Sequence, residues 1–447
     1  GIMKLNKAIF MVIVLLSFGQ SVNASPEIET LMDMLLKNGM ITDAQYVILK
    51  AQLNRSLMQN NNEKLTLQTQ IAEVTRPAAV EVSVKGQVIV KKHDGAFTTK
   101  FGARVMADAA VYNNDDNTIG DGTKIRRARM SLQGKMYHDW GYKLEYDFAT
   151  GHNKGIADAF VEYQGFDDVS FRVGNMKDPF SLQFQMNANY NLFMERSLTN
   201  GLNTGRHIGA MAYTHRKNWT ASAGLFGESV QSEGGANDEG FGFGSRITYI
   251  PINNENLMLH LGLSTNYRDA GDAATLRFKQ QPESNVSGIN IVDTGGLKNV
   301  DSHAKYGLEI AMVSGPLSVQ SEYVAASVTR NIQPNLDFDS WYLQVGYLLT
   351  GESRQYKQWK FGKITPNSNM GNGGGGAWEL GIRYSTINLN DEDVFGGEVS
   401  SFTLGANWFA TTTIRFSANY IRVFDLNGGP MDPVQPDIFE FRSQWAF

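Results

Sequence analysis

The sequence predicts an all-β protein, a sixteen-stranded antiparallel transmembrane β-barrel that follows a short helical or coiled-coil N-terminal arm. Three observations predict this fold. After about residue 80, apolar and polar residues alternate in about sixteen short segments, close to the ~10-residue length of barrel strands. Tight and long connections alternate between these segments, and Trp residues lie near segment ends. The polar faces carry many charges, which a water-filled lumen accommodates and a dry core does not.

The composition excludes several classes of protein and several kinds of site. The 447 residues include no Cys, which excludes disulfide frameworks and thiolate metal sites or nucleophiles. Beyond the N-terminal region, no stretch approaches the ~20 apolar residues of a spanning helix, and the mean hydropathy is −0.29. Barrel strands escape this test because lipid-facing and lumen-facing residues cancel in any window. The net charge of −5 argues against nucleic-acid binding by the whole chain, so a basic site must be local.

The N-terminus has the order of parts of an export signal. Met3 opens a basic stretch, an apolar run follows at 8–18, and small residues at 22–24 form a cleavage site. A short buried helix is the alternative interpretation. We expect residues 3–24 to be a cleaved signal peptide of a protein of the cell outer membrane.

Residues 25–76 differ from the rest of the chain in their helical period. Apolar residues at helical spacing predict one helix that ends at Gly39 and a second that Thr42 caps. The triplet Asn60–Asn62 predicts an interruption of the second helix. We interpret this segment as a periplasmic helical hairpin with a coiled-coil arm that self-associates. A monomeric tether that packs on nothing is the alternative.

Residues 77–97 are predicted to be a linker and residues 98–447 the barrel. In the first strand, alternation places Val105 toward lipid and Arg104 toward the lumen. The predicted long connections are 113–123, 176–204, 229–239, 269–302, 329–337, 390–399 and 425–437. They should share one rim of the barrel, opposite the tight turns. One connection on the turn side, 351–376, is long as well.

The densest basic cluster lies near the start of the second predicted strand. Alternation turns Arg127 and Arg129 toward the lumen, whereas Arg126 has the outward parity unless the strand start is irregular. Arg104 and Arg172 lie on neighbouring strands and add to the same wall. An inward row of arginines suits oxyanions such as phosphate, because each guanidinium stays charged and offers a planar fork of donors.

Acidic residues on the same strands leave a second interpretation open. Asp108, Glu145 and Asp147 share the lumen face and can pair with the arginines across the strands. The result would be a general pore with a transverse field rather than an anion filter. Residue types alone do not choose between the two.

The connection 176–204 is too long and too apolar for a plain surface loop. An apolar loop needs a surface to fold against, and the wall of a wide barrel offers one. We expect a constriction loop inside the lumen, with a lid above the barrel or a subunit contact as the alternative. Its candidate residues are Lys177, Phe180, Phe193 and Glu195.

No catalytic or metal-binding motif is supported. The glycine run at 371–376 lacks the Lys-Ser/Thr of a phosphate-binding loop, and the acidic 115–122 lacks the final Glu of a calcium-binding hand. The seven His residues show no paired metal spacing. We therefore expect no enzymatic activity, no cofactor and no metal.

Several specific stretches occur in order between residues 100 and 447. They are Phe-Gly-Ala-Arg at 101–104, Ile-Arg-Arg-Ala-Arg at 125–129, 138–147, Phe-Met-Glu-Arg-Ser-Leu at 193–198, 347–357 with Leu-Thr-Gly-Glu, 376–384 with Ala-Trp-Glu-Leu, and 404–409. Together they resemble the phosphate-selective porin O/P family of Gram-negative outer membranes. The connection that corresponds to 351–376 is long in that family too.

The resemblance implies a sixteen-stranded trimeric porin whose third loop folds inward and whose arginines draw anions toward a narrow zone. The positions that match the family's ladder or constriction arginines are Arg104, Arg126, Arg127 and Arg196. The fifth long loop, 269–302, departs from the pattern, because selective members crowd arginines there and this chain has only Arg277, Lys279 and Lys298. The predicted pore-lining or anion-binding set is Arg104, Arg126, Arg127, Arg129, Arg172, Arg196, Arg277 and Lys279.

The expected function is passive diffusion of small hydrophilic solutes through an outer-membrane homotrimer surrounded by lipid, with phosphate or other small anions preferred. A general porin is the first alternative, and a surface or adhesion barrel that acts through its long loops is the second. The segment 438–447 fits a barrel, since Phe441 takes the lipid face and Arg442 the lumen face. Phe447 also matches the last residue of outer-membrane barrels.

Overall fold

The computed structural model describes residues 25–39, 42–74, 80–84, 88–92, 94–113, 118–150, 155–230, 238–271, 275–371 and 373–447. The predicted signal peptide, residues 3–24, lies outside them. The chain divides into two compact units, residues 1–79 and 80–447. Within the described ranges, no helix is both long and apolar enough to cross a membrane.

The first unit is a pair of helices, α2 (Ser25–Lys37) and α3 (Asp43–Val74). Gly39 follows α2 with a φ of 69°, a conformation that glycine adopts without strain. Thr42 caps α3 reciprocally: the Gln45 N–H donates to Thr42 Oγ1 at 3.3 Å, and the Thr42 N–H donates to Gln45 Oε1 at 2.9 Å. Contrary to the prediction, α3 continues through Asn60–Asn62. Asparagine costs a helix only about 0.7 kcal/mol per residue relative to alanine, so three of them need not end it.

Residues 77–97, predicted as a linker, contain a β-hairpin. Strands β1 (Val80–Val84) and β2 (Val88–Lys92) pair with each other, and β2 pairs with Thr98–Phe101 at the start of β3. Their valine-rich sequences favour strand. Strand β3 thus pairs with β4 along its length, while on its other side β2 covers its start and the last strand pairs with it from Arg104 onward.

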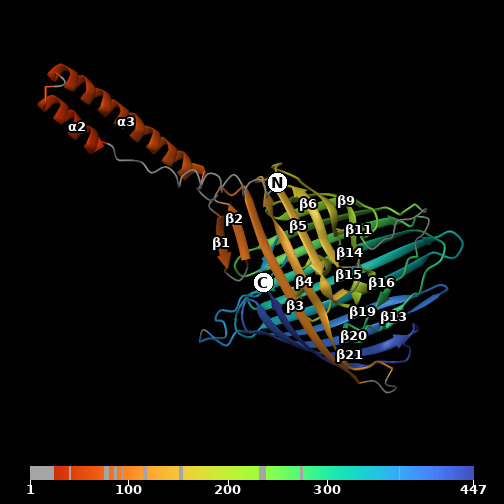
Figure 1. Ribbon diagram of the computed structural model, residues 1–447. Coiled ribbons are helices and arrows are strands. Elements are labelled where there is room, and N and C mark those ends of the chain that lie inside the picture. Colours follow the sequence, from red (N-terminus) through yellow and green to blue (C-terminus); the bar gives the residue numbers. More distant parts are fainter. Residues whose placement is uncertain are drawn as a thin grey trace. The chain divides into compact units, whose positions relative to one another are not determined.

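Sixteen strands form a closed antiparallel barrel (Figure 1), because the last strand pairs with the first. They are β3 (Phe97–Asn113), β4 (Gly122–Met136), β5 (Trp140–Asp147), β6 (Ile156–Tyr163), β7 (Ser170–Lys177), β8 (Arg206–His215), β9 (Trp219–Phe226), β10 (Gly242–Asn253), β11 (Met258–Asp269), β14 (Val300–Ser314), β15 (Leu317–Arg330), β16 (Leu336–Leu348), β19 (Ala377–Asp391), β20 (Val394–Phe409), β21 (Ile414–Asn427) and β22 (Asp437–Ala446). The predicted fold class and strand number are confirmed.

Side chains alternate across the barrel wall. In β16, Trp341 and Leu343 are exposed on the outer face, while Tyr342 and Gln344 are buried inside. Neighbouring strands add stacked outer aromatics, such as Trp378 over Trp408 with ring centroids 5.6 Å apart. An outer face of this kind suits the hydrocarbon of a membrane.

The connections of one rim, which we call the turn rim, are short, and those of the other, the loop rim, are mostly long. Residues 390–399, predicted as a long connection, depart from this pattern. β19 runs to Asp391 and β20 begins at Val394, so only a two-residue turn remains. A register shift between Asn388 and Asn390 lets the pairing of β19 with β20 continue through this segment. Its Asn, Asp and Gly residues are typical of loops, which is why a long connection was predicted.

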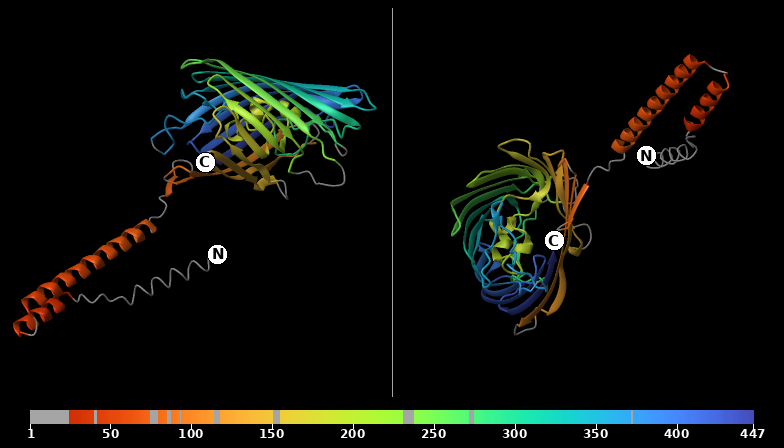
Figure 2. Two further views of the ribbon diagram at one scale, coloured as in Figure 1. Left: turned by 90° about the horizontal axis from the view of Figure 1, so that it is seen from above. Right: turned by 90° about the vertical axis from the view of Figure 1, so that its left-hand side faces the viewer.

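Three connections fold into the barrel. The inward loop, 178–205, carries the short helices α4 (Leu182–Gln185), η2 (Ala188–Tyr190) and η3 (Leu198–Leu202). The second inward loop, 270–299, carries β12 (Lys279–Gln280) and β13 (Val292–Asp293). The long turn, 349–376, lies on the turn rim and carries β17 (Tyr356–Lys357) and β18 (Lys360–Phe361). Figure 2 shows the helices of the inward loop inside the ring of strands.

An apolar cluster fills part of the interior near the loop rim. Phe278 and Ile291 of the second inward loop pack there with Phe180 and Leu198 of the inward loop. The wall contributes inward-facing Val324, Val328, Phe338, Ile387, Val423 and Ile438. The strand patterns suggested a uniformly polar lining, but part of the interior is apolar. The inward loops cover this apolar part of the wall, which would otherwise face water.

Candidate functional site

A β-bulge turns two consecutive arginines of β4 toward the lumen. β3 and β4 shift register by one residue after the pair Met106–Arg127, which leaves Arg126 as the extra residue. Regular alternation would place Arg126 outward. Instead its Nε and Nη2 donate to the two carboxylate oxygens of Glu195 in the inward loop, at 2.8 and 2.9 Å. The irregular strand start brings Arg126 onto the same side as Arg127.

Glu195 joins the inward loop to two distant strands. Besides Arg126, it accepts from Nη2 of Arg442 on β22, at 2.8 Å. Arg442 also binds Asp108 through Nε and Nη2, both at 2.7 Å, so Asp108 neutralises Arg442. Burial disfavours the charged form of Glu195, but Arg126 and Arg442 outweigh it and hold the pKa of this carboxyl below its usual range. The carboxylate therefore stays ionised and clamps the loop to the wall.

Glu283 of the second inward loop is a buried carboxylate with donors from three elements. Its exposure is 1%, and Arg383 of β19 donates to its Oε2 from Nε and Nη2 at 3.1 and 2.6 Å. Thr403 adds a bond at 2.8 Å, Ser385 donates through its hydroxyl, and the N–H of Leu198 in the inward loop donates at 3.1 Å. This carboxylate fixes both inward loops to β19 and β20.

Arg383 also contacts the inward loop directly. Its Nη1 donates to the carbonyl oxygen of Glu195 at 3.1 Å, and its guanidinium carbon lies 4.4 Å from the ring centroid of Phe193. Phe193 is thereby buried against the wall.

Two arginines hold consecutive carbonyls at the tip of the inward loop. Arg354 of the long turn donates from Nη1 to the carbonyl oxygen of Tyr190 at 2.6 Å. Arg415 of β21 donates to the carbonyl oxygens of Asn191 and Leu192 at 2.8 and 3.0 Å. The loop tip is thus held from the wall and from the long turn.

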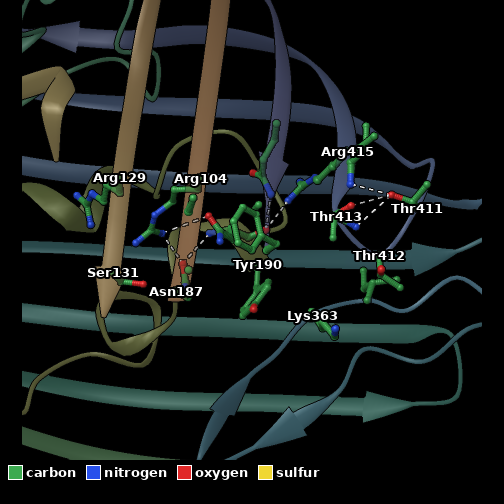
Figure 3. A pocket seen from close by; sticks show the side chains of 18 of the residues that line it. Arg104, Arg129, Ser131, Asn187, Tyr190, Lys363, Thr411, Thr412, Thr413 and Arg415 are labelled. Carbon is green, nitrogen blue, oxygen red and sulfur yellow. Dashed lines mark hydrogen bonds between the residues drawn. The ribbon is translucent and has the colours of Figure 1, made fainter. Parts of the chain in front are cut away.

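Arg104 of β3 holds the side chains of the same tip. Its Nη1 donates to Oδ1 of Asn187 at 2.6 Å and to Oδ1 of Asn189 at 3.2 Å, while Nη2 donates to Glu145 at 2.8 Å. Figure 3 shows Arg104 directed toward Asn187. With an exposure of 6%, Arg104 is an anchor of the loop.

Ion pairs join charged side chains along the wall from β4 to β8. They are Arg129–Glu145 at 2.8 Å, Arg129–Asp147 at 2.6 Å, Lys143–Asp158, Arg172–Glu162 at 2.7 Å and Arg206–Asp158 at 2.7 Å. Glu145 and Asp147 thus pair with arginines across strands, as the second interpretation of the sequence requires. Cations outnumber carboxylates along this wall once the inward loop and the long turn are added.

Several cations inside the barrel or at its turn rim make no ion pair with any carboxylate in the described part of the chain. They are Arg127, Lys177, Arg196, Lys305, Lys360, Lys363 and Arg415. Arg127 contacts Met106 Sδ at 3.6 Å, and Lys177 and Arg196 donate to carbonyls of the inward loop. Burial, together with nearby Arg206, lowers the pKa of Arg196 to about 10, which leaves it charged at neutral pH.

The structure places some of the predicted site residues at the inward loop and others away from it. Lys177, Phe180, Phe193, Glu195 and Arg196 lie in or beside the inward loop, within the barrel. Arg172 does not lie on a strand next to the arginine cluster of β4, as predicted, but on β7, three strands away. Its guanidinium carbon is 4.1 Å from the ring centroid of Phe160, and it pairs with Glu162. Arg277 and Lys279 are exposed on the second inward loop; Arg277 pairs with Asp293, and neither bonds to the inward loop among the residues described.

Sequence reasoning missed five residues that hold the inward loops. They are Glu283, Arg354, Arg383, Arg415 and Arg442. The lumen parity of Arg383, Arg415 and Arg442 was a usable signal, because an inward arginine beside a polar loop backbone has donors to satisfy. Glu283 carries no local signal, since its role depends on how the second inward loop folds.

Comparison with known proteins connects this architecture to a family. The profile of the family described as phosphate-selective porin O and P matches residues 99–447. Porin O of Pseudomonas aeruginosa is 29% identical over 395 residues, which cover 78% of this chain and 88% of that protein. An uncharacterised protein of Caulobacter vibrioides is 30% identical over 376 residues, 79% of this chain and 74% of that protein.

Solved structures share the fold at low sequence identity. An anion-selective porin from Comamonas acidovorans has a TM-score of 0.51 at 14% identity, over 78% of this chain and all of that chain. The trimer form of OmpT of Vibrio cholerae has a TM-score of 0.50 at 12% identity, over 79% of this chain and all of that chain.

Proposed function

The chain belongs to the phosphate-selective porin O and P family of outer-membrane channels, and we propose that its channel passes small anions, phosphate among them, in preference to cations. The observation that carries this proposal is the charge balance inside the barrel. The cations gathered by the β4–β8 wall, the inward loop and the long turn are Arg126, Arg129, Lys143, Arg172, Lys177, Arg196, Arg206 and Lys360. The carboxylates of the same elements are Glu145, Asp147, Asp158, Glu162, Asp178, Glu195 and Glu352. The same elements also contain the cations Arg127, Arg354 and Lys363, so positive charges remain in surplus.

A surplus of fixed positive charge in a narrow passage favours anions. One uncompensated charge 8 Å from an ion contributes roughly 2 kcal/mol at an effective dielectric constant near 20. Low-dielectric walls concentrate this field and raise the local concentration of counter-ions. The partly exposed side chains of Arg126, Arg172 and Arg206, at 21%, 25% and 22%, place guanidiniums where a passing ion can approach them.

The inward loop is the proposed constriction. Its side chains and carbonyls are held by Arg104, Arg354, Arg383 and Arg415, and its carboxylate Glu195 by Arg126. A loop that is anchored at this many points keeps a fixed position, so the passage beside it keeps a fixed width. Ion selectivity requires a passage of fixed width.

A general porin is the second candidate. The ion pairs of Glu145 and Asp147 with Arg104 and Arg129 favour it, because paired charges cancel at a distance. A homotrimer in outer-membrane lipid is also proposed; the family resemblance and the exposed apolar outer face support it.

Reversal potentials in planar bilayers test the proposal. The full-length protein is recorded in a tenfold KCl gradient, first alone and then with millimolar phosphate. We expect a reversal potential of the sign for chloride permeation and a chloride current that phosphate reduces. A reversal potential near zero, with no effect of phosphate, would support the general porin; one of the cation sign would overturn both.

A further inference from the structure

A cavity of about 320 Å³ opens beside the tip of the inward loop, near the turn rim (Figure 3). Side chains of the loop tip, the long turn, β3 to β5 and the turn between β20 and β21 line it. Its volume is at the lower end of the ~300–1,000 Å³ typical of small-molecule sites. Neither the anchors nor the charge surplus described above account for it.

The walls of this cavity are held rigidly. Asn187 and Asn189 are bonded to Arg104, and the carbonyl of Tyr190 is bonded to Arg354. Such fixed geometry lowers the entropy that a ligand must remove on binding.

The polar groups that remain available are mostly neutral. Among the residues described, the side chains of Ser131, Gln133, Tyr190, Lys363 and Thr412 line the cavity and form no hydrogen bond with another protein group. By contrast, the cations Arg104, Arg129, Lys143 and Arg415 are already engaged with carboxylates or carbonyls. In the view of Figure 3, Tyr190 lies between Arg104 and Lys363. The cavity thus offers one available cation, Lys363, among hydroxyl and amide groups.

We propose that this cavity binds hydroxylated organic anions, solutes with one acidic group on a polyol or sugar framework. The ammonium of Lys363 pairs with the acidic group. The hydroxyls of Ser131, Thr412 and Tyr190 and the amide of Gln133 bond the ligand hydroxyls, while the Tyr190 ring supplies an apolar face for the carbon skeleton. A bare inorganic anion engages the cation and leaves the neutral groups to water. The inference rests on the proposed anion preference and specifies a substrate class for it.

Single-channel recordings of the full-length protein test this proposal. Four probes are added at equal concentration: glucose 6-phosphate, gluconate, glucose and inorganic phosphate. We expect at least one of the two hydroxylated anions to interrupt the current for longer than glucose or phosphate does. The two arms then separate a phosphate ester from a carboxylate as the acidic group. Equal interruption by inorganic phosphate, or by neutral glucose, overturns the proposal.

Two variants localise the effect. Tyr190→Phe keeps the ring and the carbonyl that Arg354 holds but removes the hydroxyl, and should shorten the hydroxylated-anion dwell time about three- to tenfold, as expected for one lost hydrogen bond, without changing the phosphate effect. Lys363→Gln should shorten it further. Lys357→Gln, at an exposed lysine of the same long turn, is the matched control. An unchanged dwell time in both cavity variants would overturn the proposal.

The reversal potential separates the two possible failures. If it has the anion sign but no hydroxylated anion binds preferentially, only the cavity proposal fails. If it has the cation sign, the proposed function fails with it.

Discussion

Nη1 of Arg354 donates to the carbonyl oxygen of Tyr190 at 2.6 Å, although the two residues are 164 positions apart. Nη2 of the same guanidinium donates to Glu379 on β19 at 2.5 Å, in a pair whose side chains are 4% and 1% exposed. One arginine therefore ties the long turn, the wall and the tip of the inward loop together. The tip of the inward loop is thus held by a residue that enters from the opposite rim.

Replacement of Arg354 should loosen the inward loop. Arg354→Met removes both bonds and leaves Glu379 without its cation, and loss of one partner of a buried pair costs about 3–5 kcal/mol. We expect noisier open-channel current and a lower unfolding temperature. Single-channel recording and circular dichroism on heating measure the two effects. Arg277→Met breaks an exposed pair and is the control; equal noise in both variants would contradict this role.

The bulge at Arg126 should matter for selectivity. Arg126→Gln removes a partly exposed cation from the lumen and leaves Glu195 with one arginine partner fewer, so both changes disfavour anions. We expect the anion-to-cation permeability ratio to fall about twofold or more, since even ~0.4 kcal/mol suffices for that change. Arg422→Gln alters an exposed arginine paired with Asp437 and should change the ratio little. Equal effects would show that Arg126 does not face the permeation path.

The fold could be predicted from the sequence because barrel strands have a local signature. Alternation is a property of each segment alone, so the faces of Val105 and Arg104 in β3 or Trp341 and Tyr342 in β16 follow from period-two spacing. The side of Arg126 could not be settled in this way, because a bulge arises from the register between two strands. The hairpin at 390–399 was missed for a similar reason, since its loop-like residues are held by partners on the facing strand.

The candidate site was predictable only in part. Loop length and apolarity were enough to suggest that residues around Phe180 and Phe193 fold inward. Which wall residues would meet them depends on contacts between segments far apart in sequence, such as Arg442 with Glu195 or Arg383 with Glu283. No single-strand pattern contains that information.

The charge of Lys360 should make anion preference depend on pH. Burial, and then the nearby cations Lys143, Arg172 and Arg246, lower the pKa of this ammonium to about 8, with Asp158 opposing them. Below pH 8 the side chain is protonated and adds a positive charge, and above pH 8 it is neutral. Anion selectivity should therefore fall as the pH rises from 7 to 9.

Reversal potentials across that pH range check this dependence. Lys360→Gln should reduce the step and shift the selectivity at pH 7 toward that of the unaltered protein at pH 9. Lys357→Gln, an exposed neighbour on β17, should retain the step. A step of unchanged size in Lys360→Gln would assign it to another group.

Glu283 should contribute more to the free energy of unfolding than an exposed glutamate does. Glu283→Gln leaves the buried guanidinium of Arg383 without its carboxylate, and we expect a loss of roughly 3 kcal/mol in the free energy of unfolding. Urea denaturation followed by tryptophan fluorescence measures it. Glu255→Gln, in an exposed tight turn, is the matched control. A loss no larger than that of the control would mean that the second inward loop is held mainly by its apolar contacts.

The arm should contribute to assembly rather than to the barrel. Four apolar side chains of α3 are between 58% and 70% exposed: Val47, Ile48, Met58 and Leu65. The packing of α2 against α3 therefore leaves apolar surface uncovered, which is typical of an interaction site. Self-association of arms would bury it, whereas the barrel unit has its own closed sheet and core. Deletion of residues 25–74 should therefore leave the heat-induced unfolding of the barrel unchanged and lower the temperature at which the oligomer dissociates on gels. An unchanged dissociation temperature would exclude this role, and Leu65→Ser with Lys64→Ser as its control tests it without a deletion.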